Sequence, residues 1–313
     1  MRSSISSSKS EIKVLAVLLC VLLAAEVSMR IFGPAFSLEL RRTHEIPVNA
    51  RTMAAAEGMR FVVLGNSLTN AGFDAAAFTK ELAQSGVTPV HIQVRHFPGS
   101  GSCEWFHIFK HFFVDTARLP DVLILPFNIT SVQDDFPVTI GRLVNFCDVN
   151  DIPGVLFNDF HDFGDRTEFL HAYASTSFAN RDKVRQAVFD ILIPHYHSGE
   201  TAIHTASTTP IPDETSSLVA GSYQQLERLM LLARSHGVIV IAVPMPASQP
   251  YSIDAELIGI IQSTGSLYAD ARMEAGLTLD EFRDGIHMNR RGAGLFSRAL
   301  ARHLQAKLPH DVE

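Results

Sequence analysis

Short apolar runs, separated by segments of helical pattern, restrict this chain to one class of fold. The runs end at turns or polar residues and cover 59–64, 90–94, 121–127 and 238–243. Their length and their Val and Ile content favour buried strands over helices. Helical patterns cover 74–84, 104–113, 221–235 and 297–308. Buried strands that alternate with helices predict an α/β fold with a central parallel sheet covered on both faces.

The N-terminus carries another apolar run of a different character. Residues 14–25 contain no charged side chain and follow a Ser-rich leader with basic residues at positions 2, 9 and 13. The run alone has the length of a signal-peptide core. A helix over 12–32 is long enough to span a bilayer as an uncleaved anchor if Lys13 and Arg30 reach the two interfaces. Whether the segment is cleaved stays open at this point.

The basic leader predicts that the N-terminus is cytoplasmic and that the following domain is periplasmic or extracellular. We therefore expect a signal anchor or transmembrane segment in 1–35, a linker in 36–58 and one large domain in 59–308. Within the anchor, Glu26 would lie about one turn inside the outer membrane boundary.

Composition excludes several function classes. The 26 Lys and Arg residues face 33 Asp and Glu residues, and the formal net charge of -7 argues against a nucleic-acid partner. A hydrophobic content of 46% with 19% charged residues excludes a disordered chain. Three cysteines in 313 residues are too few for a disulfide scaffold. Cys20 lies in the apolar run, so Cys103 and Cys147 remain, either as a pair or as two buried free thiols, the favoured interpretation.

The segment 157–215 interrupts the alternation of strands and helices. It is rich in His, Asp, Ser, Thr and Pro and contains no clear strand, which predicts a partly helical insertion that shapes a substrate cleft. Its candidate metal ligands match no zinc spacing, so we expect neither a metal nor another cofactor. These ligands are Asp159, His161, Asp162, Asp165, His171, His195, His197 and His204.

Polar motifs follow the first three predicted strands, where ligands bind in open parallel sheets. Ser67 ends the motif after the first strand, Gly99 and Gly101 follow the second, and Asn128 follows the third. Asp284 and His287 precede the closing helix. A Ser nucleophile, a His base and an Asp that orients the His form an acyl-transfer site, and N–H and amide groups can stabilise the oxyanion.

These motifs resemble the signature blocks of the SGNH/GDSL hydrolases. The blocks are Gly65-Asn66-Ser67-Leu68-Thr69, the turn 99–102, the stretch 120–128 and the stretch 284–292, in the order that the family has. The resemblance implies a three-layer α/β/α flavodoxin-like fold, Ser67 as nucleophile, and Asp284 and His287 as its partners. It implies an oxyanion hole made by Ser67, Gly101 and Asn128, with Gly99 as the competitor of Gly101. The anchor is similar to that of membrane-anchored bacterial members.

Two positions depart from the family pattern. Asn66 replaces the usual Asp, and Ile129 follows Asn128 where an acid is usual. Asn158, which follows the apolar residues 155–157, is a rival for the place of Asn128. The aromatic residues at helical spacing in 105–113 are expected in the core, not in a ligand platform.

The leading hypothesis is therefore a membrane-anchored, extracytoplasmic ester hydrolase or O-acyltransferase. Its expected substrates are acetyl or acyl esters of cell-surface or exported polysaccharide, and its expected partners are this acylated carbohydrate and the membrane. The alternative is a catalytically inactive subunit of a polysaccharide export pathway that binds glycan or assists assembly. A weaker third possibility is a phosphodiester or lipid hydrolase.

Overall fold

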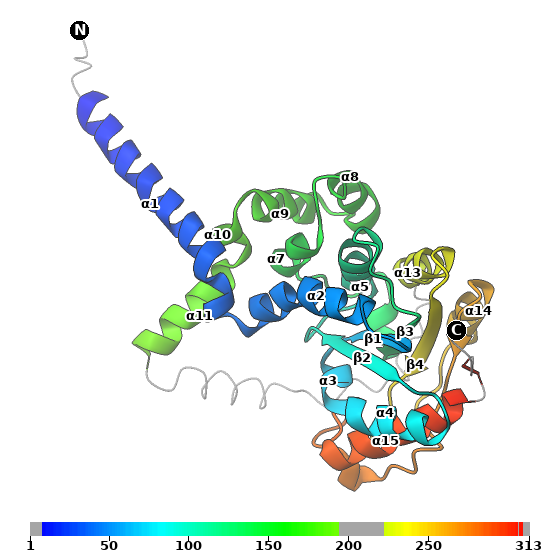
Figure 1. Cartoon of the computed structure of the whole chain (residues 1–313). Helices are drawn as coiled ribbons and strands as arrows, with labels where there is room; N and C mark the ends of the chain where they lie inside the picture. The colour runs from blue at the N-terminus through cyan, green and yellow to red at the C-terminus, as the bar shows by residue number, and fades with distance from the viewer. Residues whose placement is uncertain (1–7, 194–221, 306, 309–313) are drawn as a thin grey trace.

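The centre of the fold is a parallel sheet of five strands, seen in a computed structural model that describes residues 8–193, 222–305 and 307–308 (Figure 1). The strands are β1 (Met59–Gly65), β2 (Val90–His96), β3 (Val122–Phe127), β4 (Ile239–Pro244) and β5 (Leu267–Tyr268). Their order is β2-β1-β3-β4-β5, and every neighbouring pair is parallel. This is the strand order of flavodoxin-like sheets, so the predicted α/β class is confirmed.

Helices cover both faces of the sheet because successive strand residues point to opposite sides and both sides are apolar. On one face, Val62 and Leu64 pack with α5 (Ser102–Phe109), η1 (Lys110–Val114), α13 (Gln224–Ser235) and α14 (Ala255–Ser263). On the other, Phe61 and Val63 pack with α4 (Ala75–Gln84) and α15 (Arg290–Gln305). The result is the expected three-layer α/β/α arrangement. The aromatic residues expected in the core are there: Trp105, Phe109, Phe112 and Phe113 are buried, and Phe106 packs against them.

Residues 36–58, which the sequence suggests as a linker, instead contain helix α2 (Leu38–Ala54). Ser37 caps the helix by accepting from the N–H of Leu40. Ile46, Ala50 and Met53 join the core on the α5 side of the sheet. Their helical spacing is hidden in the sequence by the charged residues between them and by Pro47, which lies inside the helix.

Helix α1 (Ser8–Phe36) projects away from the sheet and its covering helices (Figure 1). Its stretch Glu11–Ala35 is long and apolar enough to cross a membrane, judged by length and composition. Large apolar side chains along it, such as Leu15 and Leu22, are exposed.

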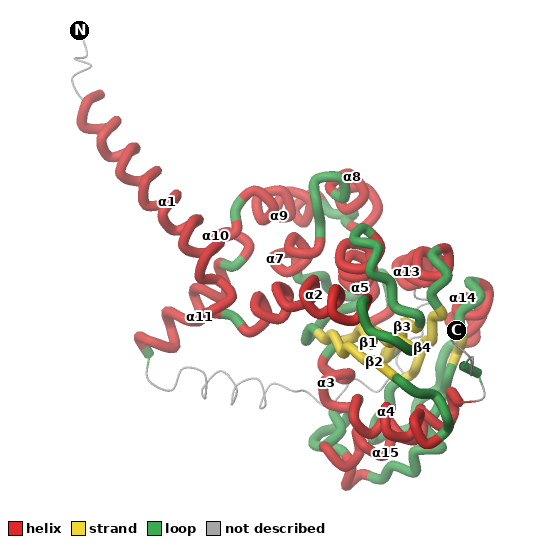
Figure 2. Tube along the Cα trace, in the orientation of Figure 1, coloured by secondary structure: helices red, strands yellow, loops and turns green. Residues whose placement is uncertain are grey.

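Short helices carry the chain from β3 into the insertion, and the described part of this region consists of helices joined by loops (Figure 2). A small core of its own includes Leu143, Val155 and Phe169. His195, His197 and His204, three of the candidate metal ligands named from the sequence, lie outside the described residues. The helices are α6 (Ile129–Val132), α7 (Ile140–Leu143), η2 (Val144–Phe146), α8 (Ile152–Gly154), η3 (Val155–Asp159), α9 (Phe163–Ala174), α10 (Thr176–Ala179) and α11 (Arg181–Leu192).

Candidate active site

Ser67 is the first residue of helix α3 (Ser67–Gly72), directly after β1. Asn66 forms the cap of this helix, with its Oδ1 accepting from the N–H of Leu68 at 3.0 Å. A side chain at Gly65 would overlap the side chain of Thr69, so the turn requires glycine there. A residue at the start of a helix has no intrahelical acceptor for its N–H. The turn thus presents both the hydroxyl and the N–H of Ser67 at the carboxyl edge of the sheet.

His287 and Asp284 lie on a tight loop between β5 and α15. Phe282 and Met288 form an antiparallel bridge at its base, and the N–H of Arg283 donates to the carbonyl of His287 at 2.8 Å. Asp284 does not cap the closing helix. Asn289 does so, since its Oδ1 accepts from the N–H groups of the next turn at 2.9 and 3.0 Å.

A continuous chain of hydrogen bonds joins the three residues that the sequence singles out. His287 Nε2 lies 3.1 Å from Ser67 Oγ, and His287 Nδ1 lies 2.9 Å from Asp284 Oδ2. The other oxygen of Asp284 accepts from the N–H groups of Ile286 and His287 at 2.9 and 2.7 Å. The side chain of His287 is 30% exposed and that of Asp284 55% exposed, so the pair faces solvent.

The environment of Asp284 favours its ionised form. Partial burial raises the pKa of the carboxyl, but the N–H groups of His287 and Ile286 and the imidazole of His287 outweigh it, and the pKa is lowered. A carboxylate only accepts, so Nδ1 of His287 is the nitrogen that donates in this contact. In the neutral imidazole with this tautomer, Nε2 accepts from the Ser67 hydroxyl. In this arrangement the Ser67 hydroxyl donates to His287 and His287 donates to Asp284, which are the directions that a serine nucleophile needs.

The turn after β2 is tied to the turn that carries Ser67. Asn66 Nδ2 donates to the carbonyl of Ser100 at 3.4 Å, and Ser100 Oγ donates to the carbonyl of Gly65 at 3.3 Å. The Asn66 amide therefore donates on one side and accepts on the other. An ionised Asp has no proton to donate, so this departure from the family pattern has a local structural role.

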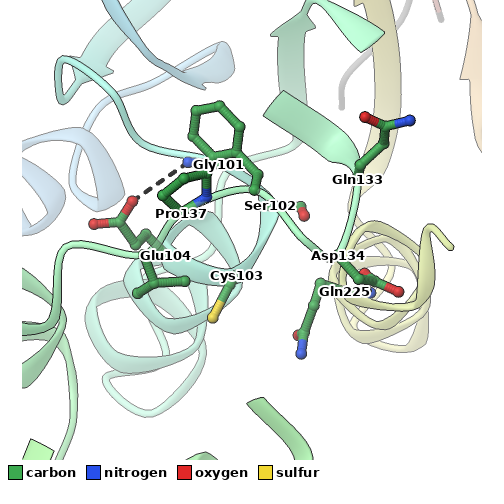
Figure 3. A pocket seen from close by; sticks show the side chains of 10 residues that line it. Gly101, Ser102, Cys103, Glu104, Gln133, Asp134, Pro137 and Gln225 are labelled. Carbon is green, nitrogen blue, oxygen red and sulfur yellow. Dashed lines mark hydrogen bonds between the residues drawn. The ribbon is translucent and has the colours of Figure 1, made fainter. Parts of the chain in front are cut away.

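The expected oxyanion donors Gly101 and Asn128 lie at the ends of β2 and β3, but both have partners within the chain. The N–H of Gly101 donates to Glu104 Oε2 at a long 3.3 Å (Figure 3). Asn128 is half-buried, and its Nδ2 donates to Thr130 Oγ1 at 2.7 Å. An oxyanion at this site has to compete with Glu104 for the N–H of Gly101 and with Thr130 for the amide of Asn128. The competing Gly99 is exposed with φ +66, outside the buried part of the turn.

Sequence reasoning missed Glu104 and Arg142, whose buried side chains are hydrogen-bonded to the backbone of the turn after β2. Their side chains are 1% and 3% exposed, and Arg142 Nε donates to Glu104 Oε1 at 2.7 Å. Arg142 also donates to the carbonyl groups of Pro98 at 2.8 Å and Gly99 at 3.4 Å. A further contact at 3.3 Å reaches Glu39 of α2. No local pattern marks an Arg on the four-residue helix α7 as a partner of this turn.

Burial raises the pKa of Glu104 to about 7, against the opposing effect of the Arg142 charge. The turn above it is closely packed. A Cβ at Gly101 would lie 2.6 Å from the carbonyl of Ser131 and 2.6 Å from the ring of Phe136. The cavity beside Gly101 in Figure 3 measures about 10 Å³, the space of about one water molecule.

Other candidates from the sequence have structural roles. Asn158 is exposed on η3 and does not follow a strand, so it is not the rival of Asn128. The buried carboxylate of Asp159 contacts His107 at 2.7 Å and Arg228 at 2.6 Å, which joins η3 to α5 and α13. Among the described candidates of the insertion, only Asp159 belongs to a group with metal-ligand geometry, together with Cys103 and His107.

Cys103 and Cys147 are buried free thiols, the interpretation that the sequence favours. Cys147 Sγ lies 3.5 Å from His107 Nδ1, and burial raises the pKa of both thiols. A raised pKa favours the protonated thiol, which is a weaker nucleophile than the thiolate.

No family model matches the chain, and no curated protein matches its sequence. Among solved structures, the chain is similar to a lipase/acylhydrolase from Enterococcus faecalis, with 14% identity, a TM-score of 0.40 and coverage of 82% of this chain and 100% of that one. It is also similar to an acetylxylan esterase from Geobacillus stearothermophilus, with 13% identity, a TM-score of 0.39 and coverage of 80% and 96%. A putative lipolytic protein of the G-D-S-L family from Desulfitobacterium hafniense shows 11% identity, a TM-score of 0.37 and coverage of 79% and 99%. These similarities are distant, with identities of 11–14%.

Proposed function

We propose that the chain is a serine ester hydrolase or O-acyltransferase of SGNH/GDSL type. The observation that carries the proposal is the unbroken hydrogen-bonded series Ser67–His287–Asp284 at the carboxyl edge of the parallel sheet. In this proposal Ser67 is the nucleophile, His287 is the general base and acid, and Asp284 orients His287.

The chemistry has two halves. Ser67 Oγ attacks the ester carbonyl carbon while His287 Nε2 takes the hydroxyl proton, which gives a tetrahedral intermediate. His287 then returns the proton to the departing alcohol, and the acyl group stays on Ser67. In the second half a water or a sugar hydroxyl gives its proton to His287 and attacks the acyl carbon, which gives a second tetrahedral intermediate. His287 then returns the proton to Ser67 Oγ as the acyl–Oγ bond breaks, and the free acid or the acylated sugar leaves.

The N–H of Ser67, which starts α3, is the first donor for the oxyanion. In our proposal the N–H of Gly101 and the amide of Asn128 are the second and third. As the oxyanion forms, the Gly101 N–H must exchange its hydrogen bond to Glu104 for one to the oxyanion, and the Asn128 amide must do the same with its bond to Thr130. The Gly101–Glu104 bond is long, at 3.3 Å, and therefore weak, so it is the easier of the two to exchange.

The substrate class follows from the proposed location. Helix α1, with its basic leader, supports a single-pass anchor with the catalytic domain outside the cytoplasm. Acetyl or acyl esters of cell-surface or exported polysaccharide are the polymeric esters that such a domain would meet. A free sugar hydroxyl on the same polymer would serve as the acceptor of a transferase.

Hydrolysis of p-nitrophenyl acetate by the full chain in detergent tests the proposal. The wild type is expected to release nitrophenol with saturation kinetics, and Ser67→Ala is expected to reduce this rate to that of the buffer. Equal rates for the two proteins would contradict the proposal. Addition of a soluble glycan acceptor separates the two outcomes, because a transferase forms acyl-glycan and a hydrolase forms only free acid.

A second candidate function is a catalytically inactive glycan-binding or assembly subunit. The specific observation in its favour is that Gly101 and Asn128 have partners inside the chain. In that case glycan binding is retained in Ser67→Ala, and no ester is cleaved by either protein.

A further inference from the structure

Helix α11 turns its apolar face away from the protein. Val184, Val188, Ile191 and Leu192 follow helical spacing and are 41%, 43%, 82% and 69% exposed. A surface helix of a soluble domain usually turns such a stripe toward the core. The described part of the chain therefore leaves these apolar side chains of α11 largely uncovered.

Lys183 joins α11 to the domain from a side of the helix that does not carry the four exposed apolar residues. Lys183 contacts Glu39 of α2 at 2.8 Å and donates to Asn180 Oδ1 at 2.9 Å. Glu39 also contacts Arg142, so the helix is joined to the supporting network under the turn after β2. These contacts agree with the exposure of the apolar residues on the outward side of α11.

The start of helix α10, which directly precedes α11, is hydrogen-bonded to α1, the proposed anchor. Glu26 of α1 accepts from the N–H groups of Thr176 and Ser177 at 2.9 and 3.0 Å and from Ser175 Oγ at 2.9 Å. Glu26 lies within the stretch Glu11–Ala35 that is long enough to span a membrane. Helix α10 therefore lies beside the C-terminal part of α1, and α11 leaves from the base of α1 (Figure 1).

We propose that the apolar face of α11 rests on the lipid bilayer beside α1, as an interfacial helix that sets the orientation of the domain above the membrane. The inference rests on the anchor in the proposed function but not on its catalysis. A helix with apolar side chains on one face and basic residues next to them is the type that lies in the headgroup region. Arg181 and Arg185 are the exposed basic residues there, and each is in contact with an exposed acid, Arg181 with Glu168 at 2.6 Å and Arg185 with Asp182 at 3.1 Å. On the membrane, anionic headgroups would compete with these two acids for the arginines.

Depth-dependent quenching in proteoliposomes tests this placement with the full chain. Ile191→Trp places a reporter on the apolar face, and Asp190→Trp places one at an exposed position on another face of the same helix. Val17→Trp reports insertion of α1. The native Trp105 is fully buried in the domain core and gives a constant background. The vesicles contain phosphatidylethanolamine and phosphatidylglycerol, with or without a dibrominated phosphatidylcholine that quenches Trp in contact with lipid chains.

The expected result is quenching by brominated lipid at positions 17 and 191 but not at 190. Quenching at 17 without quenching at 191 would leave the anchor in place and overturn the placement of α11. A Trp at 191 that is shielded from acrylamide but not quenched by brominated lipid would mean that protein covers the face, which also overturns it. Absence of quenching at 17 would contradict the insertion of α1 in the membrane, and therefore also the placement of α11 beside it. Ester hydrolysis by Ile191→Trp, measured in parallel, reports separately on the catalytic proposal.

Discussion

The Nε2 atom of His287 lies 3.1 Å from the Oγ atom of Ser67, although the two residues are 220 positions apart in the chain. Strand β1 brings Ser67 to the carboxyl edge of the sheet, and the loop closed by Phe282 and Met288 brings His287 to the same edge. Backbone hydrogen bonds hold the turn that carries Ser67 and the loop that carries His287. The contact between the two side chains therefore depends on both local structures and on the packing of α15 against α4 and α3.

Asp284→Asn is expected to lower kcat by about 10²- to 10⁴-fold. The Asn amide can present an N–H to Nδ1 of His287 and so favours the tautomer that cannot accept the Ser67 proton. Steady-state kinetics on p-nitrophenyl acetate measures the effect. Asp280→Asn, on the same loop and exposed, is the matched control and is expected to keep wild-type kcat. Unchanged kcat in Asp284→Asn would remove Asp284 from the proposed mechanism.

Arg142→Met is expected to lower the free energy of unfolding by about 3–5 kcal/mol, measured above the pKa of Glu104. The substitution leaves the Glu104 carboxylate buried without its ion-pair partner, and it frees the carbonyl groups of Pro98 and Gly99. The double variant Arg142→Met/Glu104→Met removes both charges and should regain part of the stability. Urea unfolding of the three proteins makes the comparison. A double variant no more stable than the single one would argue against a paired role.

Stability is expected to depend on pH through Glu104. Burial raises its pKa from 4.5 to about 7, so between these values the folded chain holds a proton that the unfolded chain has released. The contribution of this group to stability therefore falls as pH rises through that window. Glu104→Gln, which stays neutral, should flatten the fall in Tm, whereas the exposed Glu57→Gln should not. Parallel Tm curves for wild type and Glu104→Gln would show that Glu104 does not titrate there.

Gly101→Ala should damage the site more than Gly99→Ala. A Cβ at Gly101 meets a backbone carbonyl and a Phe ring at 2.6 Å, so the turn has to move, at a cost of about 1–3 kcal/mol. At Gly99 no atom lies within 4 Å, and only the positive φ opposes the change, at about 1–2 kcal/mol. We expect kcat to fall strongly in Gly101→Ala and to stay near wild type in Gly99→Ala. The reverse order would assign the oxyanion donor to Gly99.

The sequence predicts the strands of this fold where their apolar runs are long enough to be buried on both faces. β1 to β4 lie where the runs predict them, within one or two residues. β5 was missed because it has two residues, Leu267 and Tyr268, and exists only by pairing with β4. α2 was missed because charged residues and Pro47 hide its buried positions.

The candidate site is predictable to the extent that it lies in short motifs. Ser67, Asp284 and His287 stand out because each belongs to a local pattern next to a predicted element. Arg142 and Glu104 do not, because their interaction joins two segments through a buried ion pair, and no local spacing encodes such a contact. The N–H of Gly101 likewise has an acceptor that only the folded turn provides.

Fluorophosphonate labelling of the full chain, followed by mass spectrometry of the peptide that contains Ser67, tests whether His287 activates Ser67 as a nucleophile. Attack by Ser67 Oγ on phosphorus expels fluoride and leaves a covalent adduct that no second step removes. We expect an adduct on Ser67 in the wild type, none in Ser67→Ala, and much slower labelling in His287→Ala. An unlabelled Ser67 in the folded wild type, or equally fast labelling in His287→Ala, would contradict this activation.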